Sequence, residues 1–179
     1  MTDSEILDIF KSGQRQQAFN LIVRTYGERL YQHVRRMVLY HDDADDCMQN
    51  IFLRVWNALD TFREDSGLYT WLYRIATNEC ISYLKKRRLS TLFSHDDTAE
   101  RLSADSSFDG NKIQAALHAA IGKLPPKQKA VFIMRYFDEI PYGQMSEMLG
   151  TSEGALKASY HHAYEKVKSS LQEQADDLF

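Results

Sequence analysis

Apolar side chains recur at three- and four-residue steps along nearly the whole chain, and this spacing is the period of an amphipathic α-helix. In the first half the spacing predicts a short helix near residues 6–10, a long one over about 14–40, a third that opens at the acidic run 42–46, and a fourth over about 69–88. A polar loop over residues 60–67 separates the last two. No stretch alternates as a half-buried strand does, so the expected fold class is all-α.

The pattern changes over about residues 89–111, where Ser, Asp and Thr are frequent and no helical period persists. Helical stripes then return over residues 113–124, after Pro126, from Pro141 to Leu149, and in a last long helix capped by Thr151 or Ser152. The sequence therefore predicts two small helical domains, 1–90 and 112–179, joined by an acidic linker over residues 91–111.

Composition narrows the class of protein. Hydrophobic residues make up 44% of the chain and charged residues 26%, which is ordinary for a globular protein. No apolar run approaches the roughly 18 residues that a membrane span needs. The chain starts acidic and polar, unlike a secretory signal, and Cys47 and Cys80 lack metal-ligand spacing. We therefore expect a cytoplasmic protein without membrane insertion, metal or other cofactor.

Charge is nearly balanced overall, with 22 Lys and Arg against 25 Asp and Glu. Basic charge is concentrated in residues 71–88, where Arg74 and the run Lys85-Lys86-Arg87-Arg88 face only one acidic residue, Glu79. Four adjacent like charges repel one another and gain from a phosphate partner, although the run also fits a solvated helix end.

Trp71, Arg74 and Asn78 are three and then four residues apart, so they share one helix face. An aromatic ring beside a cation and an amide suits unstacked single-stranded bases. Trp71 fits a core position equally well, and Asn78 could instead cap a local carbonyl. This face is a candidate site for single-stranded nucleic acid.

The end of the chain has the layout of a helix-turn-helix: a helix over residues 140–149, a turn at Gly150 and a capped helix from Glu153. In such a unit the second helix lies in the DNA major groove. Its apolar stripe would comprise Leu156, Tyr160, Ala163, Val167 and Leu171, which leaves Lys157, Ala158, His161 and His162 facing outward. A plain helical hairpin has the same layout.

Three segments together resemble a known family. Residues 42–56, DDADDCMQNIFLRVW, resemble the core-polymerase-binding helix of bacterial sigma factors. Residues 61–63, TFR, followed by 69–78, YTWLYRIATN, closely resemble the promoter-melting segment of the extracytoplasmic-function (ECF) subgroup of the sigma-70 superfamily. Residues 124–128, LPPKQ, then 135–137, RYF, and the helix-turn-helix resemble region four of that subgroup. The segments follow the family order and cover essentially the whole chain.

The resemblance implies a transcription initiation factor rather than an enzyme, with domain 1–90 as region two and domain 112–179 as region four. Its implied partners are the RNA polymerase core, promoter DNA and an anti-sigma factor that could hold it at the inner membrane; no small-molecule substrate is expected. The implied polymerase contacts are Asp46, Gln49, Asn50 and Arg54. The implied −10 contacts are Phe62, Arg63, Tyr69, Trp71, Arg74, Asn78, Lys85, Lys86, Arg87 and Arg88. The implied −35 contacts are Ser152, Lys157, Ala158, His161 and His162.

Two other classes of protein fit parts of the sequence. The run 42–46 matches the Asp-Asp-x-x-Asp pattern with which all-α isoprenoid synthases bind magnesium and a diphosphate. However, no second carboxylate motif is present, and each predicted domain is too short for such a cavity. A stand-alone helix-turn-helix regulator would explain the C-terminal half of the chain but leaves residues 62–78 without a role.

Overall fold

The computed structural model describes residues 1–90 and 111–175, and within those ranges every regular element is helical. The N-terminal half contains α1 (Asp3–Lys11), α2 (Arg15–Val38), α3 (His41–Ala58), the 3-10 turn η1 (Leu59–Thr61) and α4 (Leu68–Ser90). The C-terminal half contains α6 (Lys112–Gly122), α7 (Pro126–Tyr136), α8 (Tyr142–Leu149) and α9 (Glu153–Glu173). The predicted all-α fold is confirmed. The predicted linker, apart from Asn111, lies outside the described residues.

Local sequence signals set the helix ends. The hydroxyl of Thr2 accepts the N–H of Glu5 at 3.3 Å while the Glu5 carboxylate accepts the N–H of Thr2 at 2.7 Å, which makes a capping box at α1. Asn111 caps α6 through its side-chain oxygen. Pro126 occupies the first turn of α7, where its missing N–H costs nothing. Gly150 ends α8 in the left-handed conformation, at φ +63°.

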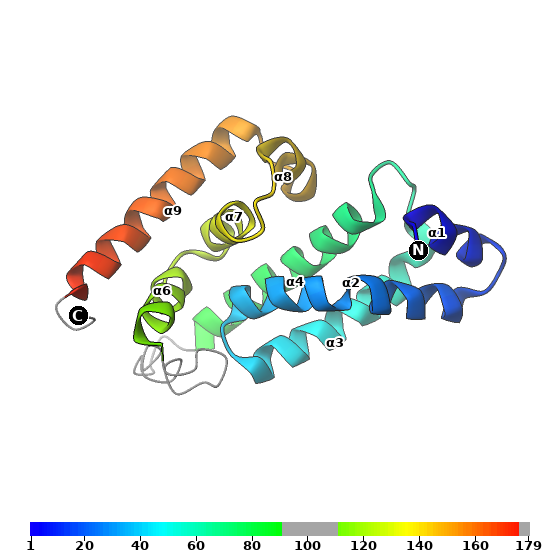
Figure 1. The fold of residues 1–179 in the computed structure, drawn as a ribbon, viewed down its shortest axis with the longest axis horizontal. Helices are drawn as coiled ribbons and strands as arrows, with labels where there is room; N and C mark the ends of the chain where they lie inside the picture. Colours follow the sequence, from blue (N-terminus) through cyan, green and yellow to red (C-terminus); the bar gives the residue numbers. More distant parts are fainter. Residues whose placement is uncertain (91–110, 176–179) are drawn as a thin grey trace.

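The N-terminal half is a bundle of α2, α3 and α4, with α1 folded against one end of α2 (Figure 1). Its core is the apolar stripe of each long helix, and the central residues are fully buried: Ile22, Leu30, Val34, Met37, Cys47, Ile51, Val55, Leu72, Ala76 and Cys80. The two cysteines, distant in sequence, are free thiols in contact inside this core. The hydrogen bond to Cys47, together with burial, raises the pKa of Cys80.

The C-terminal half is built around α7. Helix α9 packs along α7 and also contacts α6 and α8. Phe132 of α7 is 1% exposed, and its ring stacks on Tyr136 and Tyr160 with centroids 5.2 and 5.7 Å away. Leu156 and Ala163 of the predicted inward stripe are buried here, as is Val167. The helix-turn-helix, α8 and α9, is therefore held rigidly by aromatic and aliphatic packing.

The two halves share one hydrophobic core. Helices α7 and α8 pack against α4, and α6 and α7 pack against α2, so the C-terminal half lies along one side of the bundle (Figure 1). The periodicity of the sequence predicts the two sets of helices but carries no signal for this contact. None of the described helices is both long enough and apolar enough to cross a membrane.

Candidate polymerase and nucleic-acid interfaces

Helix α3 presents a polar face to solvent. Asp46, Gln49 and Asn50 are exposed. The opposite face of the same helix is buried in the bundle and comprises Ala44, Cys47, Met48, Ile51 and Val55. Arg54 is also exposed, but its Nε lies 2.5 Å from the Glu79 carboxylate of α4, and this ion pair ties α3 to α4. The structure thus places all four predicted polymerase contacts on one helix, with Arg54 already committed to a partner inside the protein.

Leu53 lies among these polar side chains and is 61% exposed. It follows Asn50 by three residues, so the two side chains are neighbours on the helix surface. We did not predict a role for it from the sequence. The sequence does contain a signal for its exposure: Leu53 lies outside the apolar stripe of α3, so an apolar side chain at this position is expected to face solvent.

The loop between η1 and α4 begins and ends in aromatic contacts. The Phe62 ring packs on Trp71, with centroids 5.0 Å apart and planes tilted by 49°. The Tyr69 ring stacks on Tyr26 at 5.8 Å, and the guanidinium of Arg29 lies 4.1 Å from its centroid. Burial raises the pKa of Tyr69. Phe62, Tyr69 and Trp71 are all half-buried, so each packs against the protein and keeps part of its ring at the surface.

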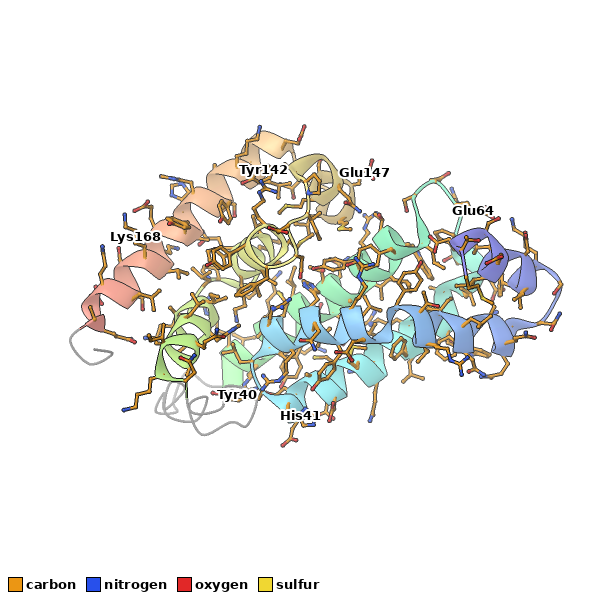
Figure 2. The ribbon with its side chains drawn as sticks, viewed as in Figure 1. Tyr40, His41, Glu64, Tyr142, Glu147 and Lys168 are labelled. Carbon is orange, nitrogen blue, oxygen red and sulfur yellow. The ribbon has the colours of Figure 1, made fainter. Side chains whose placement is uncertain are left out.

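Helix α1 also holds this loop in place. The backbone N–H of Leu68 donates to the Asp3 carboxylate at 3.2 Å, and the Lys11 ammonium lies 2.6 Å from the Glu64 carboxylate. Figure 2 shows Glu64 in the loop beside α1. Nothing in the sequence indicated that α1 positions the loop, because these partners are far apart along the chain. Arg63, in the same loop, is exposed.

The outer face of α4 carries most of the remaining predicted −10 contacts. Arg74 and Asn78 are exposed, and so are Lys85, Lys86 and Arg88.

Arg87 differs from its basic neighbours because it is bound within the protein. Its guanidinium pairs with Asp43 of α3 and lies 5.2 Å from the Tyr40 ring centroid. Burial acts to lower the pKa of Arg87, but the Asp43 carboxylate acts more strongly in the opposite direction, so the pKa of Arg87 is raised. Three cations of the run, rather than four, are therefore directed to solvent.

Asn78 borders a cavity of about 280 Å³ between the two halves. Ile81 of α4 also lines it, and residues of α7, of the end of α8, of the turn that follows and of the start of α9 complete the lining: Lys127, Ala130, Val131, Leu149, Thr151, Leu156 and Ser159. The face of α4 that carries Asn78 thus lies opposite the helix-turn-helix. This neighbourhood depends on the packing of the halves and could not be predicted from the spacing of residues.

The helix-turn-helix exposes its predicted reading face. Ser152 is the cap of α9, and its hydroxyl accepts the N–H of Ala155 at 3.2 Å. Lys157 is exposed, and its ammonium lies 5.7 Å from the ring centroid of Tyr142, which Figure 2 shows beneath the start of α9. The other predicted contacts are exposed as well: Ala158, His161 and His162.

No group of three or more His, Cys, Asp or Glu side chains within residues 1–90 and 111–175 is arranged to hold a metal ion.

A three-helix bundle with a basic outer helix, followed by a helix-turn-helix, is the architecture of a sigma-70-type transcription factor, and both parts match its family models. Residues 22–89 match sigma-70 region 2, and residues 114–167 match sigma-70 region 4. The region 2 match explains residues 62–78, which a stand-alone helix-turn-helix regulator leaves without a role.

The curated relatives point to one group within this class. The ECF RNA polymerase sigma factor SigW of Bacillus subtilis is 28% identical over 171 residues, which cover 88% of this chain and 91% of SigW. The ECF RNA polymerase sigma-E factor of Escherichia coli is 27% identical over 184 residues, covering 96% and 95% of the two chains. The chain belongs to the ECF group of the sigma-70 family, and it is a transcription initiation factor.

Solved structures share the fold. The structure of CnrH in complex with the cytosolic domain of CnrY superposes with a TM-score of 0.63 at 25% identity, covering 88% of this chain and 89% of that chain. The sigma factor RpoE of Bartonella quintana, in complex with the anti-sigma factor NepR, gives a TM-score of 0.64 at 18% identity and covers 86% and 96%. The fold expected from the sequence is therefore confirmed.

Proposed function

We propose that this sigma factor binds the RNA polymerase core through α3, captures bases of the −10 element with α4 and the preceding loop, and reads the −35 element with α9. The single observation that carries the proposal is the placement of Trp71, Arg74 and Asn78 on one partly exposed face of α4, beside a loop fixed at both ends. Opening a promoter needs such a rigid receptor for an unstacked base.

The polymerase contact is assigned to the exposed face of α3. Asp46, Gln49 and Asn50 supply polar groups, and Leu53 supplies an apolar centre that a partner would bury. Interfaces gain most of their affinity from a few buried side chains surrounded by polar ones. Arg54 contributes less, because Glu79 already neutralises it. Named relatives of this chain are RNA polymerase sigma factors, which supports this partner.

The −10 contact is assigned to α4 and the loop. Removing a base from the stack costs a few kcal/mol, so the open strand must be held. The aromatic pair Phe62 and Trp71 offers a stacking surface, and Asn78 offers both a donor and an acceptor to a base edge. The exposed cations Lys85, Lys86 and Arg88 are then placed to contact phosphates further along the strand. Arg87 is not assigned this role, because it pairs with Asp43.

The −35 contact is assigned to the outward residues of α9. In a helix-turn-helix the first turns of the second helix approach base edges, and here Lys157, Ala158, His161 and His162 occupy those turns. Ser152 acts mainly as the helix cap that fixes the start of α9.

An anti-sigma factor is the third proposed partner, and the cytoplasm is the proposed location, since the polymerase acts there. The support is that the sigma factor RpoE of Bartonella quintana, which shares this fold, is solved in complex with the anti-sigma factor NepR, and that CnrH, at 25% identity, is solved in complex with the cytosolic domain of CnrY.

The test is Asn78→Ala, with Asn57→Ala, an exposed asparagine at the end of α3, as the matched control. Because one base contact is worth about 1–3 kcal/mol, Asn78→Ala should reduce strand opening on a duplex promoter about tenfold to a hundredfold while binding polymerase core normally. On a template with a pre-melted bubble the variant should recover, since the opening cost is already met. Permanganate footprinting reads the melting. Normal melting of the duplex, or failure on both templates, would remove Asn78 from the melting site.

A further inference from the structure

Helix α1 lies outside the part of the chain that matches sigma-70 region 2, yet it contacts the loop assigned to the −10 element. The match to the family model begins at residue 22, whereas α1 ends at Lys11. Both ends of α1 reach the loop: Asp3 bonds the residue at which α4 begins, and Lys11 pairs with Glu64, which Figure 2 shows beside α1. A segment beyond the family match therefore borders the site that we assign to promoter melting.

The Asp3 carboxylate caps a helix other than its own. Its Oδ2 accepts the backbone N–H of Leu68, the first residue of α4, at 3.2 Å. The first N–H groups of a helix have no partner within that helix, and the positive end of the helix dipole favours a negative charge there. The first turn of α4 contains no acidic residue of its own. Asp3 therefore supplies from α1 both an acceptor and a charge that the start of α4 lacks.

The other carboxylate oxygen of Asp3 holds an aromatic ring that packs on the loop. This oxygen, Oδ1, accepts the hydroxyl of Tyr26 of α2. Tyr26 is 8% exposed, and its ring stacks on Tyr69 with centroids 5.8 Å apart. Burial and the Asp3 carboxylate raise the pKa of Tyr26, so the hydroxyl stays protonated and continues to donate. Asp3 thus acts on Tyr69, at the end of the loop, through one intervening ring.

The loop conformation depends on contacts from outside the loop. Glu64 has a φ of 60°, in the left-handed region that a non-glycine residue rarely adopts. Its ion pair with Lys11 joins two exposed side chains, and such a pair contributes little. Asp3 is half-buried instead, and both of its partners are buried, Leu68 and Tyr26. Asp3 is therefore the stronger of these two attachments between α1 and the loop.

We propose that Asp3 is a positioning residue for promoter melting, which acts through Leu68 and Tyr69 and sets how selectively the loop and α4 hold an unstacked base. The inference rests on the −10 role proposed above for the loop and α4. A site discriminates between ligands only when the surrounding side chains hold its polar groups in place, because a site that can move also fits the wrong ligand. Helix α1 is then part of the melting machinery although it contacts no DNA.

The first experiment measures base preference. RNA polymerase holoenzymes that contain the wild type, Asp3→Ala or Asp8→Ala are compared on one promoter that the wild type melts and on its single-base −10 variants. The matched control, Asp8→Ala, removes an exposed carboxylate from the same helix. Permanganate reactivity of thymines downstream of the −10 element gives the melting of each template. Asp3→Ala should reduce the ratio of melting between the preferred base and the other bases about tenfold, and Asp8→Ala should keep the wild-type ratio.

This ratio separates positioning from a loss of stability. A variant that is merely less stable, or that binds polymerase core less well, lowers melting by the same factor on every template and leaves the ratio between templates unchanged. Circular dichroism should show unchanged helix content in Asp3→Ala. A wild-type ratio in a folded Asp3→Ala protein would overturn the inference.

Tyr26→Phe is the second variant, and it removes only the hydroxyl that Asp3 accepts. The ring and its stack on Tyr69 remain, so the change in packing is small. Its melting ratio should fall in the same direction as that of Asp3→Ala, but by less, because the bond from Asp3 to Leu68 is kept. If Asp3→Ala does not fold, Tyr26→Phe decides alone: a lowered ratio supports the positioning role, and an unchanged ratio refutes it.

Hydrogen exchange in the free full chain tests the contact itself. The backbone N–H of Leu68, followed by NMR, should exchange about tenfold faster in Asp3→Ala than in the wild type or in Asp8→Ala, because it loses its acceptor. Amides in the middle of α2 should keep their wild-type rates. Equal exchange of the Leu68 amide in Asp3→Ala and the wild type would show that Asp3 does not hold the start of α4, and the inference would fail.

The inference and the proposed function fail separately. A lowered ratio in Asp3→Ala would support the positioning role even if Asn78→Ala melts promoters normally, and the base would then be held by the loop without Asn78. If Asn78→Ala shows the expected defect while Asp3→Ala keeps the wild-type ratio, Asp3 only stabilises the fold and the assigned −10 contacts stand.

Discussion

A buried lysine at the interface gives a quantitative test of the packing. Lys129 of α7 is 3% exposed, and its Nζ has the Met37 carbonyl as hydrogen-bond partner at 3.4 Å. Burial lowers the pKa of Lys129 from 10.5 to about 8; the nearby Cys80 acts in the opposite direction, and Arg87 adds to the lowering. We predict that Lys129→Met, which keeps the length of the side chain and removes its charge, makes the protein more stable at neutral pH.

The magnitude follows from the pKa of Lys129. Because its folded-state pKa is below the unfolded value, the unfolded chain binds more protons between pH 8 and 10.5, and the free energy of unfolding rises with pH across that window. Below pH 8 the lysine is charged in both states, so the folded state carries the full cost of about 3 kcal/mol. Methionine removes this cost and loses one long hydrogen bond worth about 1 kcal/mol. The net gain of about 2 kcal/mol corresponds to a Tm rise of about 4–8 °C for a chain of 179 residues.

The assay is thermal and urea unfolding, followed by circular dichroism at pH 7 and pH 10. The advantage of Lys129→Met should be largest at pH 7 and should nearly disappear at pH 10, where the wild-type lysine is neutral when folded. Lys123→Met is the control, because Lys123 is exposed and its replacement should leave Tm nearly unchanged. If Lys129→Met is less stable than the wild type at pH 7, with the same difference at pH 10, then the buried ammonium stabilises the fold and the reasoning is wrong.

Two further predictions concern the docking face and the acid side of the stability profile. Changing Asp46 and Gln49 together to lysine should weaken binding to polymerase core about tenfold without loss of helix content, because both side chains are exposed; undiminished competition for core would contradict the docking face. Burial, helped by Arg36 and Arg35, lowers the pKa of His118 from 6.5 to about 4, so the unfolded state binds more protons between these values and stability falls as the pH drops through them. At pH 5 this loss is about 2 kcal/mol, and His118→Gln should abolish it. Urea midpoints at pH 7 and pH 5 measure the loss, and an equal acid loss in the wild type and the variant would count against it.

The local sequence determines where most helices begin and end and which face of each helix is buried. The helices begin and end where short-range signals place them, such as the acidic first turn of α3, Pro126 at the start of α7 and Gly150 after α8. In the predicted inward stripe of α9, Leu156, Ala163 and Val167 are buried, and Tyr160 and Leu171 are half-buried, because a helix with one apolar face is stabilised by covering that face. The motifs along the chain also sufficed to identify the sigma-70 family.

Only the tertiary structure decided which charged residues are available. The sequence shows Lys85-Lys86-Arg87-Arg88 as one basic run, yet Arg87 pairs with Asp43, which lies 44 positions earlier. Arg54 similarly pairs with Glu79. Spacing along a helix tells which side chains share a face, but whether a charge on that face is free depends on what an adjacent helix brings against it.

Asp138 shows the same limit most clearly. Its partners Tyr73, Arg36 and His33 lie 65, 102 and 105 positions away, and no periodic pattern connects them. Helix periodicity is a property of neighbours within about a turn, and it therefore fixes each helix and its buried face. The packing of the two halves brings the Asp138 carboxylate against donors from two other helices, and a charge is stable in the interior only with such partners, so this arrangement exists only once the chain has folded.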